Sequence, residues 1–229
     1  MGDPAEGERA PLAGLSGTDY RGLRKLYARY ARGYDRRFAR YSAATLGEAV
    51  SALGAEAPGR LVDVACGTGM LVEAVRRRWP ETPAIGVDLS AEMLEQAERR
   101  VPAGDGASGP PTQWRIGPAE ALPLEEGAAD TLTCTNAFHL VQRPVDALAE
   151  FRRVLVPGGR LVIVDWCADF RSMRALLAAL EVVRRQRRSA WTLDDLGAAV
   201  AGAGFEIARS HRFKVGPIWG LMTIVARRA

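Results

Sequence analysis

The chain has 229 residues, of which 48% are hydrophobic and 25% charged, and its formal net charge is +4 at pH 7. These values fit a globular protein and exclude a chain that is disordered throughout. The basic residues are spread along the sequence without interleaved aromatic residues, so we expect no nucleic-acid partner. No apolar run approaches the about 20 residues of a membrane-spanning helix, so no membrane span is expected.

The three cysteines, Cys66, Cys134 and Cys167, lie far apart and show no C-x-x-C spacing. This pattern argues against a metal site and against a disulfide framework, and it fits a reducing compartment. The first residues also lack the basic-then-apolar pattern of a secretion signal. We therefore expect a cytoplasmic protein without a bound metal.

The predicted elements begin after a tail. Residues 1–18 are rich in Gly, Pro and other small residues, which predicts a disordered segment. Residues 19–58 carry aromatic rings at spacings of three and four, which predicts helices with one aromatic face and a break near Gly33. That face would hold Tyr27, Tyr30, Tyr34, Phe38 and Tyr41.

From residue 59 onward, strand-like and helix-like segments alternate. The predicted strands are 60–65, 84–87, 112–116, 130–135, 160–165, 205–212 and 221–226. The predicted helices are 70–78, 91–100, 145–155, 172–188 and 192–203, the last with Thr192 as its N-cap. Such alternation predicts an α/β domain with a mostly parallel sheet. The last two strands have no helix between them, so we expect them to pair antiparallel.

The first predicted strand runs into a glycine turn in the segment LVDVACGTGM (61–70). Gly67 and Gly69 allow positive φ and a close approach of the backbone to a ligand. The helix that follows directs free amide groups toward the same place. Asp88 closes the second strand about 20 residues later, the interval at which nucleotide sites carry a ribose-binding carboxylate. The alternative for Asp88 is a turn former or helix cap.

A dinucleotide ligand is disfavoured. The dehydrogenase fingerprint G-x-G-x-x-G needs a third glycine, and Val72 stands at that position. Asp63, inside the first strand, would repel a pyrophosphate but suits a cationic group such as an amine. An NAD-dependent reductase is therefore a weak alternative.

Four segments resemble, in order and spacing, the motifs of class I S-adenosylmethionine-dependent methyltransferases: LVDVACGTGM, GVDLS, GPAEALPLEEGAADTLTCTNAFHLV and RVLVPGGRLVIVDW. The chain is most similar to the type 11 small-molecule group, which includes ubiquinone and menaquinone C-methyltransferases. The resemblance spans roughly residues 27–226. It implies a Rossmann-like seven-stranded sheet with a C-terminal antiparallel hairpin strand. Residues 19–229 would form one domain, with a helical lid over 19–58 and a core over 59–229.

The resemblance also implies S-adenosyl-L-methionine as cofactor and the residues that hold it. Asp63 would interact with the methionine amino group, Asp88 with the ribose diol, and Leu89 and Met93 with adenine. Pro118 replaces an Asp that binds the adenine amino group in the family, so the backbone at Ala119 would take a larger part. The full implied set is Tyr34, Asp63, Ala65, Gly67, Thr68, Gly69, Asp88, Leu89, Met93, Ala119, Glu120, Asn136 and Ala137.

His139 is the candidate catalytic base. It matches the first of two adjacent histidines in the family motif, whereas Leu140 replaces the second. An imidazole can accept a proton near neutral pH, although His139 could equally line the pocket or bind a backbone group. For Asp165, two interpretations stay open: a contact with substrate or a helix cap.

The acceptor is expected to be a small apolar or aromatic molecule, because aromatic side chains surround the expected site. The candidate substrate-binding residues are Tyr27, Tyr30, His139, Trp166, Phe170 and Trp219. The acceptor atom (O, C, N or S) and the oligomeric state, with a homodimer as one option, stay open. The main alternative function is a fold relative that binds the cofactor without transferring methyl, as cyclase-like or regulatory members do. An RNA methyltransferase ranks low, because neither a basic appended domain nor an N/D-P-P-Y/F motif occurs.

Overall fold

The computed structural model describes residues 20–102, 109–184 and 190–229. The strands are β1 Leu61–Val64, β2 Ala84–Asp88, β3 Gln113–Ile116, β4 Ala129–Thr135, β5 Leu155–Trp166, β6 Phe205–Val215 and β7 Trp219–Arg228. The α-helices are α1 Arg21–Tyr30, α2 Tyr34–Ala52, α3 Met70–Arg78, α4 Ala91–Arg100, α5 Pro144–Val154, α6 Arg171–Arg184 and α7 Leu193–Gly202. Two 3-10 turns are η2 Ala31–Gly33 and η3 Phe138–Leu140. The tail predicted over 1–18 and the end of the helix predicted over 172–188 lie outside the described residues.

The strands form one seven-stranded sheet in the order β3-β2-β1-β4-β5-β7-β6. Strands β1 to β5 pair in parallel, and β7 pairs antiparallel with both β5 and β6. The α/β class and the antiparallel pairing of the last two strands are therefore confirmed. The spatial order adds a feature that the sequence pattern did not predict, because β7 lies inside the sheet and β6 forms the edge.

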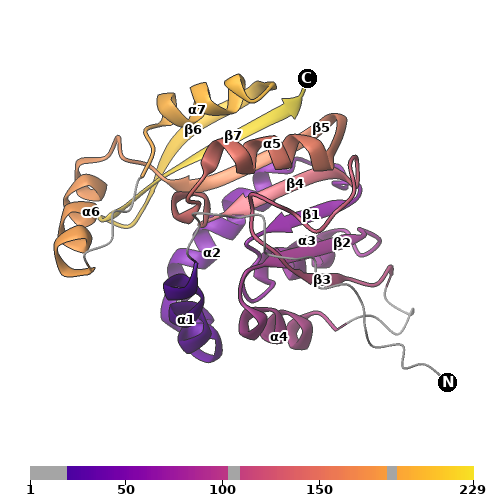
Figure 1. Ribbon diagram of the computed structural model, residues 1–229, viewed down its shortest axis with the longest axis horizontal. Helices are drawn as coiled ribbons and strands as arrows, with labels where there is room; N and C mark the ends of the chain where they lie inside the picture. The colour runs from indigo at the N-terminus through magenta and orange to yellow at the C-terminus, as the bar shows by residue number, and fades with distance from the viewer. Residues whose placement is uncertain (1–19, 103–108, 185–189) are drawn as a thin grey trace.

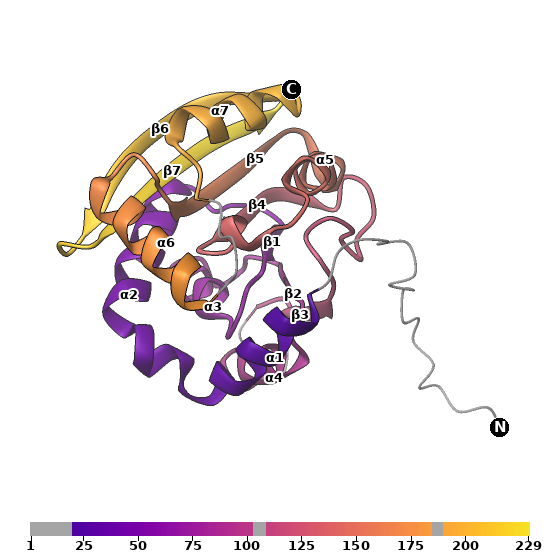
Figure 2. The same ribbon diagram turned by 60° about the vertical axis from the view of Figure 1, so that its left-hand side comes forward.

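Helices cover both faces of the sheet (Figures 1 and 2). Successive side chains of a strand point to opposite faces, and β5 shows this clearly. Leu161 and Ile163 pack in one buried cluster with residues of α5 and α7, whereas Val162 packs in the other with residues of α2 and α3. The core is thus divided into two layers by the sheet, as in other doubly covered α/β folds.

Local chemistry explains where several helices begin. Pro144 stands in the first turn of α5, where its missing N–H is not needed. Thr192 caps α7, as predicted, and its hydroxyl accepts a hydrogen bond from the Asp195 amide at 3.0 Å. Gly33 precedes α2 and ends the short turn η2, at the predicted break.

Strand β5 begins at Leu155, earlier than the predicted 160. The prediction assigned the segment V-P-G-G after Leu155 to no element, but Ala129 pairs with Leu155 and Thr131 pairs with Arg160. A register shift between these two pairs absorbs the extra residues.

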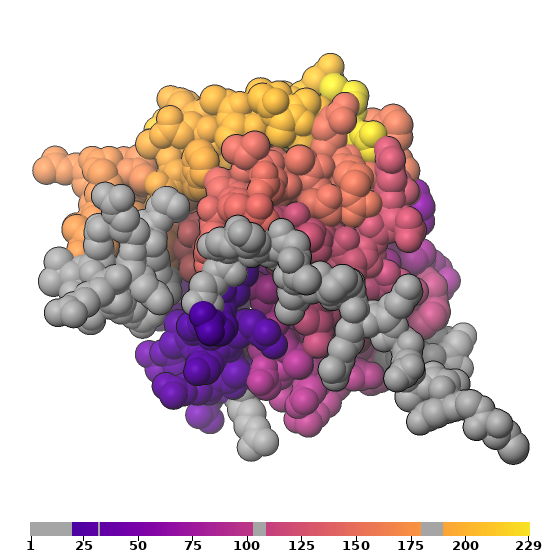
Figure 3. Space-filling view, viewed as in Figure 1, coloured from indigo at the N-terminus to yellow at the C-terminus, as the bar shows by residue number. Residues whose placement is uncertain are grey.

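Helix α1 lies near the carboxyl ends of the strands and contacts α4. Figure 3 shows α1, in indigo, beside the magenta part of the chain that includes α4. Helix α2 continues along the face that α3 also covers. Within the described residues, no helix is long and apolar enough to cross a membrane.

Candidate active site

The glycine turn after β1 has an unusual backbone. Ala65, Gly67 and Gly69 have positive φ values of 55°, 55° and 76°. A Cβ atom on Gly69 would lie 2.8 Å from the Trp114 ring, whereas a Cβ on Gly67 would meet no atom within 4 Å. Gly69 is therefore required by packing, and Gly67 keeps an open space beside the turn.

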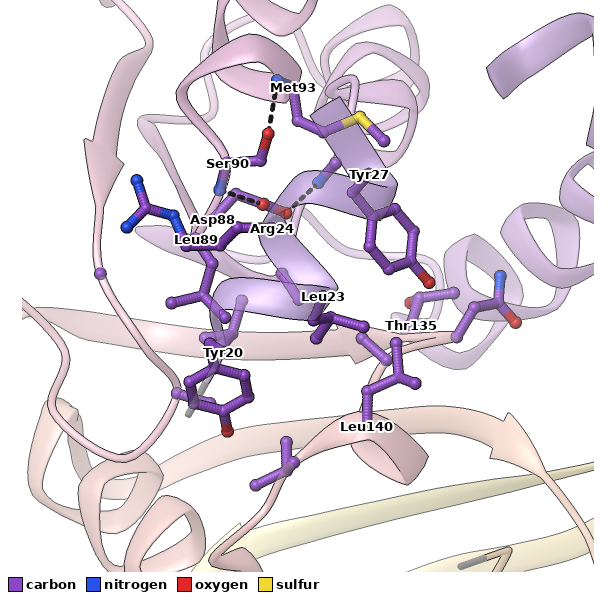
Figure 4. A pocket seen from close by; sticks show the side chains of 18 of the residues that line it. Tyr20, Leu23, Arg24, Tyr27, Asp88, Leu89, Ser90, Met93, Thr135 and Leu140 are labelled. Atoms are coloured by element: carbon purple, nitrogen blue, oxygen red, sulfur yellow. Dashed lines mark hydrogen bonds between the residues drawn. The ribbon is translucent and has the colours of Figure 1, made fainter. Parts of the chain in front are cut away.

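A pocket lies next to that space, at the carboxyl ends of β1, β2 and β4. The chain passes from β1 to β2 and β3 on one side of the sheet and places β4 on the other, so this is the topological switch point where open α/β sheets bind ligands. Figure 4 shows side chains of α1 and of the ends of β2 and β4 converging on the pocket. Among the predicted site residues, those that line it are Tyr27, Tyr34, Ala65, Gly67, Asp88, Leu89, Met93, Ala119, Asn136 and Ala137.

Helix α1 and its N-cap residue supply lining residues that sequence reasoning missed. Tyr20, Leu23 and Arg24 face the pocket together with the predicted Tyr27. No motif marks the first three, and a helical spacing of three and four was the one available signal. Further lining residues outside the predicted set are Val64, Ser90, Gly117, Thr135, Leu140 and Val141.

Asp88 both shapes and lines the pocket. Its carboxylate accepts hydrogen bonds from the Gly67 amide at 2.8 Å and from the Ser90 amide at 2.9 Å. Burial raises the pKa of Asp88, and these hydrogen bonds oppose the rise. The carboxylate thus ties the glycine turn to the end of β2 while one side of it faces the pocket.

Asp63 lies behind the wall of the pocket. It is 3% exposed and accepts a hydrogen bond from the Thr133 hydroxyl at 2.7 Å. Burial raises its pKa to about 7. Because side chains alternate along a strand, Asp63 points away from the side on which Val64 lines the pocket.

Glu120 and Thr68 hold the N-terminal segment rather than line the pocket. Glu120 accepts hydrogen bonds from the Tyr20 hydroxyl and from the Arg143 amide. The Thr68 hydroxyl donates to Asp35 of α2 at 2.7 Å.

Arg100 reinforces the contact between Thr68 and Asp35. It pairs with Asp35 and with Glu73, and its Nε donates to the Thr68 carbonyl at 2.9 Å. We call Asp35, Thr68, Glu73 and Arg100 the helix anchor, because they fix the start of α2 to α3 and α4.

His139 and Asp165 form a buried pair at the exits of β4 and β5. The His139 Nδ1 lies 2.6 Å from Asp165 Oδ1, and the His139 amide donates to Oδ2 at 2.8 Å. Both carboxylate oxygens of Asp165 therefore bind His139, and Asp165 does not cap a helix. A carboxylate beside Nδ1 assigns the proton of a neutral ring to that nitrogen. Nε2 makes no hydrogen bond to the residues that the structure describes, so it is available as an acceptor.

Aromatic rings lie beside this pair, and neither they nor His139 belong to the residues that line the pocket. The His139 ring stacks on Trp166 with centroids 4.0 Å apart and planes 11° apart, and Trp219 lies 5.6 Å from Trp166. Phe170 packs in the same cluster. Tyr30 lies apart from these predicted substrate residues, with the Arg37 guanidinium 5.4 Å from the centre of its ring. In the described ranges, no group of three His, Cys, Asp or Glu side chains could hold a metal ion.

Comparisons with known proteins agree with this geometry. Residues 62–163 match the family model described as "Methyltransferase domain" (Methyltransf_11). The ubiquinone/menaquinone biosynthesis C-methyltransferase UbiE of Dinoroseobacter shibae is 39% identical over 107 residues, which cover 47% of this chain and 42% of that protein. The demethylmenaquinone methyltransferase of Deinococcus radiodurans is 34% identical over 112 residues, which cover 49% and 45%. The chain spans about half the length of the curated relatives it matches.

Solved structures support the fold. Magnesium protoporphyrin IX methyltransferase from Synechocystis PCC 6803, with bound S-adenosylhomocysteine, superposes with a TM-score of 0.73 at 17% identity, over 92% of this chain and 100% of that chain. Geranyl diphosphate C-methyltransferase from Streptomyces coelicolor gives 0.67 at 18% identity, over 82% and 76%. The fold and the matched segment, residues 62–163, are those of a class I S-adenosylmethionine-dependent methyltransferase domain.

Proposed function

We propose that this chain transfers the methyl group of S-adenosyl-L-methionine to a small apolar or aromatic molecule. The observation that carries the proposal is the pocket at the switch point, which joins the open space beside Gly67 to the carboxylate of Asp88. A glycine turn beside a carboxylate is suited to a ligand that carries both an extended amino-acid portion and a ribose diol. The named activities of the relatives, methylation of quinones and of an isoprenoid diphosphate, agree with a small acceptor.

The residues present fit this cofactor. Asp88 would accept the ribose hydroxyls, and the apolar side chains of Leu89 and Met93 would contact the adenine. Ala65 and Gly67 would let the backbone approach the methionine portion. Asp63, behind the pocket wall, would favour the amino group of that portion when its carboxyl group is ionised. When bound, the sulfonium supplies an electrophilic methyl carbon. The protein's share is to bind, orient and exclude water, and orientation can lower a barrier by about 7–11 kcal/mol.

His139 is suited to take a proton from the acceptor. Asp165 holds the Nδ1 side of the ring, which leaves Nε2 to receive the proton, and the carboxylate then stabilises the imidazolium. His139 Nε2 would take up the proton that a protonated acceptor loses when it is methylated. This step is required where the acceptor arrives protonated, as a phenol does.

The experiment combines binding with transfer. S-adenosylhomocysteine binding is measured by calorimetry, and transfer of labelled methyl is measured with a panel of phenols, quinols and thiols. We expect Asp88→Ala to weaken binding at least about tenfold, because a charge-assisted hydrogen bond is worth about 1.5–3 kcal/mol. His139→Gln should leave binding within about twofold and lower transfer by about 10²–10⁴-fold.

The outcomes separate the alternatives. No binding by the unaltered protein overturns the proposal. Binding without transfer to any acceptor class favours a fold relative that holds the cofactor and does not use it.

We also infer a cytoplasmic location and no nucleic-acid partner. The three buried free cysteines and the dispersed basic residues support these inferences. The oligomeric state, for which a homodimer is one option, is read by light scattering on the purified protein.

A further inference from the structure

We propose that Tyr41 is a positioning residue that sets the place of the His139 imidazole relative to the cofactor pocket. Its hydroxyl group joins Asn136, in the pocket wall, to Trp166, on which His139 stacks. The inference rests on the proposed function for the role of His139, but the contacts that carry it are independent of any acceptor.

The first contact fixes the wall of the pocket. The Tyr41 hydroxyl donates to Asn136 Oδ1 at 2.6 Å, and Asn136 Nδ2 donates to the Thr45 hydroxyl at 2.8 Å. Tyr41 and Thr45 are four residues apart on α2 and so lie on the same face of the helix. Both ends of the Asn136 amide are therefore bound to α2. Asn136 also has a positive φ of 59°, a conformation that its surroundings must hold in place.

The second contact reaches the candidate base. Trp166 Nε1 donates to the Tyr41 hydroxyl at 2.9 Å. The indole ring in turn forms the flat surface for His139, whose centroid lies 4.0 Å away. The Tyr41 ring packs against Trp219 with centroids 4.8 Å apart, so the phenol itself is held from the side.

The Tyr41 hydroxyl thus connects the segment that follows β4 with the end of β5. Asn136 and His139 follow β4, whereas Asp165 and Trp166 end β5. Burial raises the pKa of Tyr41, so the hydroxyl keeps the proton that it donates to Asn136. Loss of the hydroxyl would remove one hydrogen-bond partner from Asn136 Oδ1 and from Trp166 Nε1, while the ring contact of residue 41 with Trp219 would survive.

The test uses the fact that the chain contains two histidines. Their imidazole signals are resolved in an NMR spectrum, and His139→Gln assigns them. In the unaltered protein, the Cε1–H signal of His139 should lie upfield of its free position, because the ring stacks on an indole. In Tyr41→Phe, that signal should move downfield or broaden. The signal of His211, which pairs with Glu48 at 3.1 Å, should stay unchanged as an internal control for folding.

Tyr30→Phe is the matched control. It removes the same group from a ring that lies against Arg37 instead, and it should leave the His139 signal in place. With any acceptor found by the panel, Tyr41→Phe should lower kcat on the order of tenfold to a hundredfold at an unchanged S-adenosylhomocysteine Kd, because small misplacements are that costly.

The results are read separately for the two proposals. An unchanged His139 signal in Tyr41→Phe overturns the positioning role. Movement of both histidine signals in Tyr41→Phe also overturns it, because that indicates a general structural effect. Failure of the unaltered protein to bind S-adenosylhomocysteine overturns the proposed function instead.

Discussion

At the scale of single residues, the two glycines of the turn have separate roles that substitution can distinguish. Gly69→Ala should lower the free energy of unfolding by about 2–5 kcal/mol, because its Cβ would clash with Trp114 in addition to adopting a positive φ. Gly67→Ala should cost only about 1–2 kcal/mol, the price of the left-handed backbone alone. It should nevertheless weaken S-adenosylhomocysteine binding, because its Cβ enters the open space. Urea unfolding and calorimetry measure the two effects.

Gly216 provides the control for that comparison. It has a positive φ of 62°, no atom lies within 4 Å of a Cβ placed there, and it stands between β6 and β7. Gly216→Ala should match Gly67→Ala in stability but leave binding unchanged. Equal binding by Gly67→Ala and Gly216→Ala would show that the space beside Gly67 is not used.

Asp63 gives the protein a defined pH dependence. Burial raises its pKa to about 7, above the about 3.9 of an unfolded chain. Between these values the folded state holds a proton that the unfolded state releases, so this contribution to stability is full below pH 4 and is lost as the pH rises through 7. The loss should amount to roughly 2–4 kcal/mol.

The measurement compares Asp63→Asn with the unaltered protein. Because an amide cannot ionise, the urea midpoint of the variant should change less between pH 4.5 and 7.5. Parallel curves for the two proteins would show that Asp63 does not titrate in this window.

Sequence reasoning at this scale worked where chemistry is local. Gly67, Gly69 and Asp88 stand in short motifs, and the structure places Gly67 and Asp88 at the pocket. The contacts of Tyr41 with Asn136 and Trp166 could not be predicted, because they join residues 95 and 125 positions apart. Tyr20 was missed for the same reason, since it is placed by Glu120, 100 positions away.

At the scale of elements, the helix anchor decides how firmly α2 covers the site. Arg100→Met removes both ion pairs of the anchor and its bond to the Thr68 carbonyl, next to Gly67. We expect faster amide hydrogen exchange over residues 34–45 and S-adenosylhomocysteine binding that is weaker by about 3–30-fold, since one or two kcal/mol of local order are lost.

Arg99→Met is the neighbouring control. Arg99 pairs with Glu95 on the surface of α4, with side chains 69% and 63% exposed, and such pairs contribute about 0–1 kcal/mol. Amide hydrogen exchange in α2 should therefore be the same in Arg99→Met as in the unaltered protein. If both variants behave alike, the anchor does not hold the helix.

The elements themselves were largely predictable, because hydrophobic periodicity and capping residues are local signals. The start of β5 was not, since the pairing of Ala129 with Leu155 is set by the neighbouring strand. Equally, the helical spacing of 19–58 predicted helices but not that α1 would line the pocket.

At the scale of the whole molecule, ligand binding should stabilise the domain as a unit. At a concentration one hundred times its Kd, S-adenosylhomocysteine should add about 2.7 kcal/mol of stability. For a protein of this size that corresponds to a rise in Tm of about 5–10 °C in calorimetry. NADH should give no rise, because Val72 and Asp63 oppose a dinucleotide. Asp88→Ala should show a much smaller shift, and a rise with NADH alone would favour a reductase.

The order of the sheet was the part of the fold least accessible to sequence reasoning. Chain order predicts strands and their direction, but it does not determine that β7 enters between β5 and β6. This placement depends on side-chain packing, in which Met222 and Ile224 join the same cluster as Leu161 and Ile163.

That inserted strand has a kinetic consequence. Strand β6 can join the sheet only through β7, and β7 must first find β5, whose residues lie far back in the sequence. Closing such a long loop carries an entropic cost before any pairing repays it. The pairing of β1 with β4 closes a comparably long loop. Refolding from urea should therefore be slow for a protein of this size, and β6 should gain protection from solvent exchange together with β7 and not before it.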